Sequence, residues 1–486
     1  MRCLALAAEL AARGAEVHFL TRRLPGHLGE LIARLGHVVH WLPDPAGPAD
    51  VALHGYESWL GVPVEQDRDA AATILRQLRP DWLIVDHYAL DRRWEGALRQ
   101  YCGRIMAIDD LADRPHDCDL LLDQNFYLDN GRYGPLLNGR CVQLLGPRYA
   151  LLRPEFAVLR QQPRLRDGVV RRLLIAFGGM DAHDHTGQLL QALEGHLDGL
   201  VVNVVIGQAH PRREALRQFC TTHPNVCLHV QTERMGELIG QADLAIGASG
   251  IANWERFCLG TPAIVLAVAD NQVPLLQDLQ REGLVLGVTP ESPDPVGDCV
   301  RLFEYARHQP ALLQGLSRRG AGVTDGKGVQ RVIRRLLEPR FTLRPATAED
   351  CRDVYEWRNA PENRRHSHSA EIIEYATHKA WFDRVLEDPD RMLLIATLDD
   401  RSVAVVRFDM EGRSAVISIY LVPGSHGQGW GAGVIRQASE WLAAQSGVTQ
   451  ILAEVRHENH ASAAVFREAG YREDHEVLMW RQSGCK

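Results

Sequence analysis

Three glycine-rich segments have the composition of turns that bind phosphate groups. Two of them, Gly178-Gly179 and Ser249-Gly250, follow apolar stretches and precede helical patterns. The third runs from Gln428 through Gly431 and Gly433 into an amphipathic helical pattern. Unhindered N–H groups at the start of a helix offset the charge of a diphosphate, and glycine allows a close approach. Either of the first two alone could be a structural turn, whereas their recurrence at corresponding strand ends favours a ligand.

Polar residues also follow predicted strands, at the edge where parallel sheets bind ligands. Asp86-His87-Tyr88 and Asp109-Asp110 come after two apolar stretches in the first third of the chain. Asp270-Asn271-Gln272 follows a later stretch. Glu255 lies about one helical turn beyond Gly250, and a carboxylate there suits the hydroxyl groups of a ribose.

Hydrophobic patterning predicts three domains that position these residues. Residues 1–152 and 153–338 each alternate helical and buried-strand patterns, which predicts two doubly wound, Rossmann-like α/β domains. After a short link the pattern changes, and residues 341–483 are predicted as an α+β domain with a mostly antiparallel sheet. The polar stretch 161–167 and the region near 146–154 are the predicted hinge between the first two domains.

The chain begins with a helical pattern over residues 1–13, and the predicted strands follow. In chain order, the strand segments lie at 16–20, 38–42, 82–86, 104–109, 173–177, 201–207, 226–230, 242–250, 262–268, 341–346, 393–398, 403–408, 415–421, 451–455 and 477–480.

Composition excludes several classes of protein. The chain has 486 residues and a formal net charge of −8, so we expect no nucleic-acid or membrane partner. Its ten cysteines include no C-x-x-C pair, which fits free thiols in a reducing cytoplasm. No apolar stretch approaches the roughly 20 residues of a membrane span. His183 and His185 lie two apart without a suitably placed third ligand, so no metal is expected. The sequence does not indicate an oligomeric state.

Residues 341–483 resemble the GNAT superfamily of acetyl-CoA-dependent N-acetyltransferases. The resemblance rests on the Gln428-to-Gly433 loop, the strand at 451–455 and the helix headed by Asn459-x-x-Ser462. It implies acetyl-CoA as co-substrate, with its pyrophosphate on the loop, its pantetheine arm at Asn459 and its thioester between strands 415–421 and 451–455. The acetyl-CoA-binding residues that it implies are Leu421, Gln428, Gly429, Gly431, Gly433 and Asn459.

Two further features bear on this resemblance. Trp357-Arg358-Asn359 and His378-x-x-Trp381-Phe382 are similar to the subgroup that acetylates the 4-amino group of a UDP-linked deoxy-aminosugar. Phe466 stands where many members have the tyrosine that protonates the departing thiolate, so the general acid is unassigned. Tyr471 and Tyr420 are candidates, although packing is the expected role of both.

Residues 1 to about 335 resemble the family of UDP-2,4-diacetamido-2,4,6-trideoxy-β-L-altropyranose hydrolases. The resemblance rests on segments 146–156, 177–187, 248–255 and 325–332 and on Asn271-Gln272. It implies a GT-B-like two-domain fold, a role in pseudaminic acid biosynthesis, and attack of water at the anomeric carbon with release of UDP. By this resemblance, Tyr88 and Asn271 lie at the sugar, and the UDP side consists of Gly178, Gly179, Ser249, Gly250, Glu255 and Gln272.

The start of the chain departs from that family. In a doubly wound domain the helix at 1–13 would connect two strands, yet no strand precedes it. The family has a strand and a loop ending Gly-His-x-Met-Arg-Cys here, and Met1-Arg2-Cys3 matches the end of that motif. We therefore expect a shortened chain that lacks the first strand and the family's proposed general base, the histidine, and has little hydrolase activity as given.

The sequence leaves three functions open. The leading one is a bifunctional enzyme that acetylates UDP-4-amino-4,6-dideoxy-N-acetyl-β-L-altrosamine and hydrolyses the product, with fusion raising the effective concentration of the second site. The second is a GT-B glycosyltransferase joined to an acetyltransferase of other specificity. The third is a non-catalytic UDP-sugar-binding module joined to an acetyltransferase.

Overall fold

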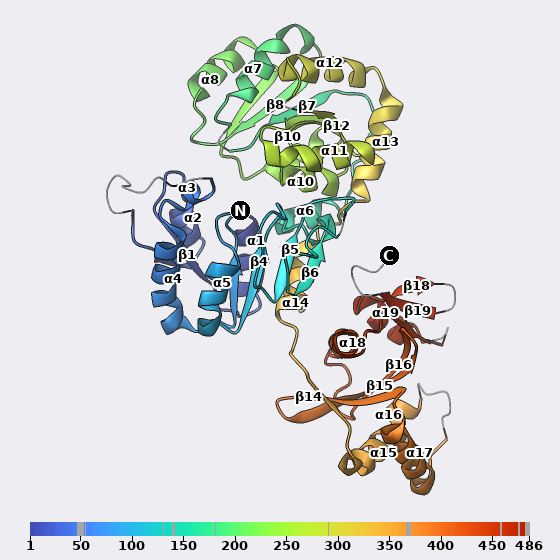
Figure 1. Ribbon diagram of the computed structural model, residues 1–486. Helices are drawn as coiled ribbons and strands as arrows, with labels where there is room; N and C mark the ends of the chain where they lie inside the picture. Colours follow the sequence, from blue (N-terminus) through green and yellow to red (C-terminus); the bar gives the residue numbers. More distant parts are fainter. Residues whose placement is uncertain are drawn as a thin grey trace. The chain divides into compact units, whose positions relative to one another are not determined.

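The structure is a computed structural model that describes residues 1–45, 53, 55–129, 131–138, 141–179, 181–289, 291–365, 371–456, 459–474 and 477–481. The chain forms two compact units, Met1–Leu336 and Leu337–Lys486 (Figure 1). Met180, within one of the predicted glycine-rich segments, lies outside the described residues. Among the helices that are described, none combines the length and apolar character needed to cross a bilayer.

The first unit contains a parallel sheet in the order β3–β4–β5–β6. Its strands are β3 (Trp82–Val85), β4 (Arg104–Ile108), β5 (Leu120–Asp123) and β6 (Val142–Leu145). One face packs against α4 (Val64–Leu78) and α5 (Arg92–Leu98), and the other against α1 (Arg2–Ala11) and α14 (Gly328–Leu336). Both faces are buried, as expected for parallel strands.

Two strands stand apart from this sheet, which corrects one prediction. β1 (His18–Thr21) and β2 (Val38–Trp41) pair with each other in parallel. No described strand hydrogen-bonds both to this pair and to β3, so the predicted single doubly wound sheet is divided in two. The short helices α2 (Gly29–Arg34) and α3 (Glu57–Leu60) lie in this part of the chain.

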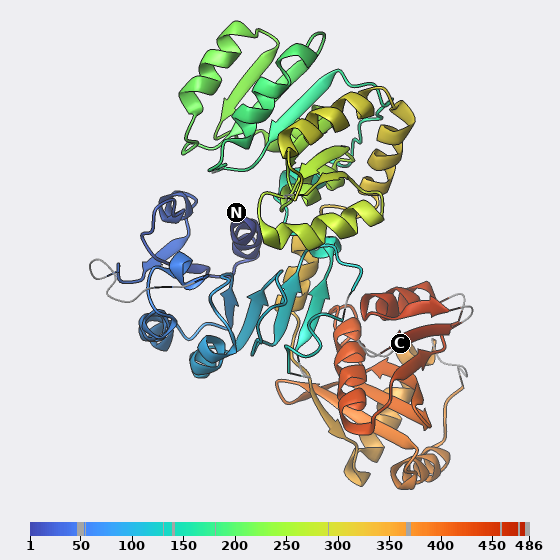
Figure 2. The same ribbon diagram turned by 45° about the horizontal axis from the view of Figure 1, so that its top comes forward.

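A second parallel sheet in the first unit has the order β12–β11–β10–β7–β8–β9. Its strands and helices form the green to yellow part of the ribbon in Figure 2. From β7 the chain winds outward to β9, then returns to the centre and winds the other way from β10 to β12. The strand order therefore reverses between the adjacent strands β7 and β10, and such a reversal opens a crevice at the carboxyl ends. The strands are β7 (Arg172–Ala176), β8 (Val201–Ile206), β9 (Val226–Val230), β10 (Leu244–Ala248), β11 (Ala263–Leu266) and β12 (Leu286–Val288).

Helices cover both faces of this second sheet, which makes it a Rossmann-like α/β layer structure. One face packs against α7 (His185–Ala192), α8 (Arg213–Thr222), α12 (Pro295–Arg307) and α13 (Pro310–Ala321). The other packs against α6 (Pro154–Leu159), α9 (Met235–Gln241), α10 (Ala252–Cys258) and α11 (Val273–Arg281). The next helix along the chain, α14, returns to the first sheet.

The second unit is built on a sheet in the order β13–β14–β15–β16–β17–β19–β18. β16 and β17 are parallel, and the other described pairs are antiparallel. α18 (Gly431–Ser446) and α19 (His460–Glu468) pack on one face, and α15 (Cys351–Asn359) and α17 (Tyr375–Glu387) on the other. The remaining elements are β13 (Thr342–Pro345), β14 (Arg391–Leu398), β15 (Arg401–Glu411), β16 (Ser414–Leu421), β17 (Gln450–Ala453), β18 (Arg472–Asp474), β19 (Val477–Arg481) and α16 (Pro361–Arg364).

Short elements complete the described chain, and some strands had no counterpart in the sequence prediction. β5, β6, β12 and β18 were not predicted, because strands of three or four residues are too short to stand out from loops. The 3₁₀ helices are η1 (Arg99–Tyr101), η2 (Pro147–Tyr149), η3 (Glu194–His196), η4 (Asp270–Gln272) and η5 (Ala348–Asp350).

Arg166 lies in the segment 161–167, which was predicted as a hinge, and it anchors this segment against the second sheet. Its guanidinium donates hydrogen bonds of 2.8–3.0 Å to the Thr261 hydroxyl and to the carbonyl oxygens of Gly240, Ala242, Leu259 and Gly260. These carbonyls lie at or just beyond the carboxyl ends of α9 and α10, where a positive charge offsets the helix dipole. Burial lowers the pKa of Arg166 to about 10.

We predict that Arg166→Met lowers the free energy of unfolding by about 2–4 kcal/mol, because several largely buried carbonyls lose their donor. Arg171→Met is the matched control, since Arg171 forms an exposed ion pair with Asp167, and it should cost less than about 0.5 kcal/mol. Urea unfolding of the full chain measures both values. Equal losses in the two variants would contradict this role for Arg166.

Candidate functional site

A cavity of about 390 Å³ in the first unit lies where strands of its two larger sheets end. It brings together five of the predicted site residues, Tyr88, Ser249, Gly250, Asn271 and Gln272. Asp86 and Asp110, which the sequence placed at the ligand-binding edge of the sheet, also line it. Arg2, Trp59 and Ile251 line it as well and were not predicted. A neighbouring cavity of about 420 Å³ shares Asp110, Leu111 and Asn271 with the first.

Arg2 joins two carboxylates on one side of the cavity. Its Nε and Nη2 donate to the Asp86 carboxylate at 3.1 and 2.6 Å, and its Nη1 donates to Oδ2 of Asp110 at 3.3 Å. Burial alone would raise the pKa of Asp86, but the hydrogen bonds and charge of Arg2 outweigh it, and the pKa is lowered. Oδ1 of Asp110 is buried and accepts no hydrogen bond from the described residues. A buried carboxylate oxygen without a partner is costly unless a ligand or water satisfies it.

Tyr88 remains a hydrogen-bond donor in this cavity. Burial and then the negative charge of Asp110 raise the pKa of its phenol above the usual range, so the phenol stays protonated at neutral pH. Arg114 lies over its ring, with Cζ 5.9 Å from the centroid. Tyr88 is hydrogen-bonded to the Asp110 carboxylate, so it can donate to a ligand only by exchanging this partner, and it cannot take a proton from water.

His87 is committed to structure rather than to proton transfer. Its Nδ1 accepts the Ala89 N–H at 3.1 Å, which leaves the proton on Nε2. The other nitrogen bonds to the Trp59 backbone, and this contact only partly offsets the lowering of the His87 pKa by burial. His87 therefore ties α3 to the loop that carries Tyr88.

The turn after β10 lines the same cavity and contains a serine hydroxyl without a partner among the described residues. Ser249 is fully buried, and its Oγ has no hydrogen-bond partner among the described residues. Its backbone N–H pairs with the Leu266 carbonyl at 2.9 Å, which fixes the turn. The Gln272 side chain closes the following turn by accepting the Val268 N–H at 3.0 Å. A buried hydroxyl without a partner is costly unless a ligand or water satisfies it.

Gly178 and Gly179 lie outside the lining of both cavities, but they occupy the strand reversal. They follow β7, and Ser249 follows the adjacent strand β10. Gly178 has a φ of +105°, a left-handed conformation that favours glycine. At Gly207, a Cβ would come within 2.0 Å of the Gly179 carbonyl oxygen, so the loops after β7 and β8 meet there.

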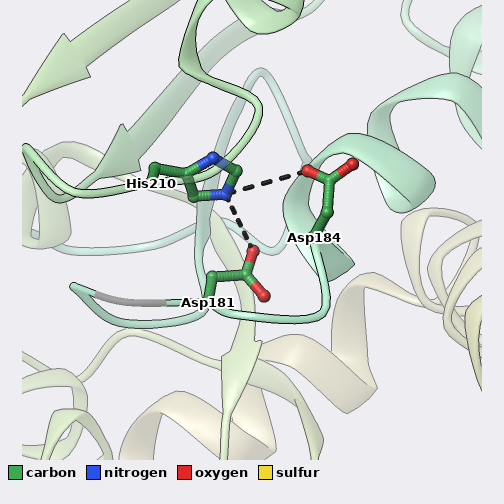
Figure 3. A group of neighbouring side chains, drawn as sticks. All are labelled: Asp181, Asp184 and His210. Atoms are coloured by element: carbon green, nitrogen blue, oxygen red, sulfur yellow. Dashed lines mark hydrogen bonds and ion pairs between the residues drawn. The ribbon is translucent and has the colours of Figure 1, made fainter.

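Asp181, Asp184 and His210 fasten these two loops together (Figure 3). The Asp181 carboxylate accepts the N–H groups of His185 and Thr186 at 2.9 and 2.8 Å, at the start of α7. Nδ1 of His210 accepts the Arg212 N–H at 3.2 Å, so Nε2 carries the proton and donates to Asp181 at 3.3 Å. His210 Nε2 also lies 3.7 Å from Oδ1 of Asp184. These contacts give the three side chains a role in holding the glycine loop.

Glu255 lies on α10 beyond the Ser249 turn and is not part of the cavity lining. Burial raises its pKa to about 7, against the opposing charges of Arg153 and Arg256. At neutral pH this carboxyl is therefore poised between its neutral and ionised forms. Hydroxyl donors of a bound ribose would favour the ionised form.

In the second unit, the loop containing Gln428 and Gly429 leads directly into the sixteen-residue helix α18. No side chain caps the amino end of α18 in the described structure, so no side chain occupies the first-turn N–H groups. Gly429 has a φ of +74° with open space where a Cβ would stand. Gly433 serves packing, since a Cβ there would come within 2.5 Å of Glu338 Oε1.

The strands beside this loop separate along their length. β16 and β17 pair only from Ser414 with Gln450 to Ile417 with Ala453, while β16 continues to Leu421. The last part of β16 therefore has its edge free of β17. The Leu421 carbonyl accepts the Asn363 side-chain amide at 2.8 Å. The separation is the arrangement in which an extended thioester arm could lie between two strands.

Asn459 and the two candidate tyrosines already have partners. The Asn459 side chain accepts the Ser462 N–H at 3.0 Å and so caps α19. The Tyr471 hydroxyl lies 2.9 Å from the Ser439 hydroxyl, and its ring packs edge-on against Phe466. The Tyr420 hydroxyl donates to the Val354 carbonyl at 3.4 Å, and burial raises the pKa of Tyr420. These contacts favour packing for both tyrosines and leave the general acid unassigned.

The tryptophan and histidine motifs of the second unit form part of one aromatic cluster. His378 is buried, and its ring lies 5.3 Å from Trp381 and 5.8 Å from Phe382. Asn359 exchanges hydrogen bonds of 2.9 Å with the backbone of Ile373 and so holds a neighbouring loop. Burial lowers the pKa of Arg358, whose Nη1 has no hydrogen-bond partner among the described residues.

The comparisons with known proteins agree with this division. Residues 340–472 match the family model of the acetyltransferase (GNAT) domain. The N-terminal half is similar to the spore coat polysaccharide biosynthesis protein SpsG of Bacillus subtilis, at 31% identity over 42% of this chain and 62% of that protein. It is also similar to the UDP-2,4-diacetamido-2,4,6-trideoxy-beta-L-altropyranose hydrolase of Campylobacter jejuni, at 26% identity over 43% of this chain and 74% of that enzyme. The chain thus spans less than two thirds of the length of SpsG.

Among solved structures, the aminoglycoside acetyltransferase AAC(6')-Ib in complex with coenzyme A is similar to 29% of this chain. The similarity covers 95% of that chain at 18% sequence identity and a TM-score of 0.27.

We predict that Glu255→Gln raises the free energy of unfolding at pH 8 by about 1–3 kcal/mol, because wild-type Glu255 must be ionised there in a buried setting. Its folded pKa is raised, so its contribution to stability is full below its unfolded pKa near 4.5 and is lost as the pH rises through about 7. The difference in the free energy of unfolding between the variant and the wild type should therefore vanish near pH 4.

Chemical unfolding of the full chain at several pH values measures this difference. Glu282→Gln is the control, because Glu282 is exposed. Asp123 also has a pKa raised to about 7 by burial, but it is present in every protein compared. A difference that stays constant from pH 4 to pH 8 would rule out the stated cause.

Proposed function

We propose that this chain is a bifunctional enzyme of pseudaminic acid biosynthesis. The second unit transfers the acetyl group of acetyl-CoA to the 4-amino group of a UDP-linked amino-dideoxy sugar. The first unit then hydrolyses the resulting UDP-2,4-diacetamido-2,4,6-trideoxy-β-L-altropyranose to free sugar and UDP. The observation that carries the proposal is one cavity lined both by the Ser249-Gly250 turn and by Asp110.

Several features of the second unit support acetyl transfer. The loop at Gln428 and Gly429 opens onto an uncapped helix, and β16 separates from β17 beside it. The N–H groups of that helix start would hold the coenzyme A pyrophosphate. The amine attacks the thioester carbonyl, a C–N bond forms, and the C–S bond breaks to release the thiol of coenzyme A.

The cavity of the first unit supports hydrolysis at an anomeric carbon. Oδ1 of Asp110 lacks a partner among the described residues, so it can accept a proton from an attacking water. The water oxygen bonds to the anomeric carbon as the bond to UDP breaks. Ser249 and the turn around it would hold the departing diphosphate, and protonated Tyr88 would donate to the sugar.

The side chains of the cavity also allow a second function for the first unit, namely binding of a UDP-sugar without hydrolysis. Asp86 is engaged by Arg2, Tyr88 is a donor, and both ring nitrogens of His87 are occupied. Asp110 is then the one cavity carboxylate, among the described residues, with an oxygen free to act. If it does not act, the first unit is a UDP-sugar-binding module that presents substrate to the acetyltransferase.

We predict that Gly429→Asp raises the KM for acetyl-CoA at least about tenfold relative to Gly429→Asn, because the added charge repels the pyrophosphate. Asparagine and aspartate both tolerate the left-handed φ of this position and have nearly the same shape. The two variants therefore differ mainly in charge. Steady-state acetylation by the full chain, followed as thiol release, measures the KM. Equal KM values would place the pyrophosphate elsewhere.

We predict that the full chain releases UDP from UDP-2,4-diacetamido-2,4,6-trideoxy-β-L-altropyranose slowly, because both ring nitrogens of His87 are engaged and Asp110 is left as the base. Asp110→Asn should slow this release by a further factor of about 100 or more. Asp198→Asn, a change at an exposed aspartate outside the cavity, should leave the rate unchanged. Anion-exchange chromatography of the nucleotide measures release. Binding of the UDP-sugar by the wild type without any UDP release would instead establish the binding-module function.

A further inference from the structure

Trp59 is an exposed tryptophan inside the cavity of the first unit. It belongs to α3, lines the cavity, and is 59% exposed. Ile251, which is 39% exposed and follows the Ser249-Gly250 turn, also lines the cavity. Large apolar side chains left open in a concave site are typical of surfaces that a ligand covers.

The position of the indole is fixed by its neighbours. Leu60 and Val62, on either side of a left-handed Gly61, are buried in the core beside β3. The Trp59 ring lies 5.3 Å from Tyr56 at 74° and 5.8 Å from Tyr88 at 44°. His87 bonds to the Trp59 backbone. The exposure of this side chain is thus not the result of a loose segment.

We infer that the Trp59 indole is the wall against which the hexose of a UDP-linked acetamido-deoxy sugar stacks. This inference rests on the proposed function and adds a specificity-determining residue to it. The face of an aromatic ring carries partial negative charge and attracts the weakly positive C–H groups of a sugar ring or a methyl substituent. Acetamido and deoxy groups add such methyl surface, so the wall favours sugars that carry them.

The position of Trp59 assigns it to the sugar rather than to the uracil base. Trp59 stands beside Tyr88, at the edge of the first sheet, where the Asp110 carboxylate also lies. The Ser249-Gly250 turn, which would hold the diphosphate, and Glu255 beyond it belong to the second sheet. A nucleotide sugar whose diphosphate lies at that turn, with its ribose toward Glu255, extends its hexose toward Trp59.

The test compares two probes, UDP and UDP-N-acetylglucosamine, by calorimetry on the full chain. Trp59→Ala should weaken binding of the sugar nucleotide about tenfold and leave the affinity for UDP within about twofold. Trp59→Phe, which keeps an aromatic face, should lose only about threefold for the sugar nucleotide. Leu165→Ala is the control, because Leu165 is 95% exposed and outside the cavity lining.

Each result has a defined meaning. Equal weakening of both probes by Trp59→Ala assigns the indole to the nucleotide and overturns the inference. A wild-type protein that binds UDP-N-acetylglucosamine no more tightly than UDP also overturns it, because the hexose then gains nothing from the wall. Absence of binding by either probe to the wild type refutes the proposed function itself. Circular dichroism of each variant confirms that the fold is retained.

Discussion

Parallel strand pairing is the constraint on which the first unit depends. Parallel strands deliver their carboxyl ends to one edge of a sheet, so loops far apart in the sequence meet there. The reversal of strand order between β7 and β10 keeps that edge open at the centre of the second sheet. Asp86, Asp110, Ser249 and Asn271 come from four different strand ends and reach one cavity for this reason. The strand topology thus brings these side chains together in one cavity.

Sequence patterning was sufficient for the elements whose apolar runs are long. The strands at 201–207 and 226–230 and the helix at 431–446 carry clear periodicity, and the structure contains them. The division of the first sheet could not be predicted, because pairing between strands is a non-local property. Likewise β5 and β6, with four residues each, become strands only through their neighbours.

The candidate site was predictable in part for a related reason. Tyr88, Ser249 and Asn271 stand directly after apolar runs, so position alone marked them. Arg2 and Trp59 lie in helices, where nothing in the local pattern distinguishes a cavity residue from a surface one. Asn459 shows the converse limit, since its place at the head of a helix is satisfied by an ordinary cap to Ser462. A pantetheine contact there would have to use the other half of its amide.

Because α14 returns to the first sheet, the chain connects the two larger sheets of the first unit at two places. The chain leaves that sheet between Leu151 and Phe156 and comes back between Leu316 and Val329, as the cores that hold these residues show. Two sheets connected by a single segment of the chain can rotate freely about it. Two connecting segments oppose such a rotation, so bending about the line through both is the easier motion. A ligand bound in the cavity would therefore be enclosed when the two sheets bend toward each other about these two crossings.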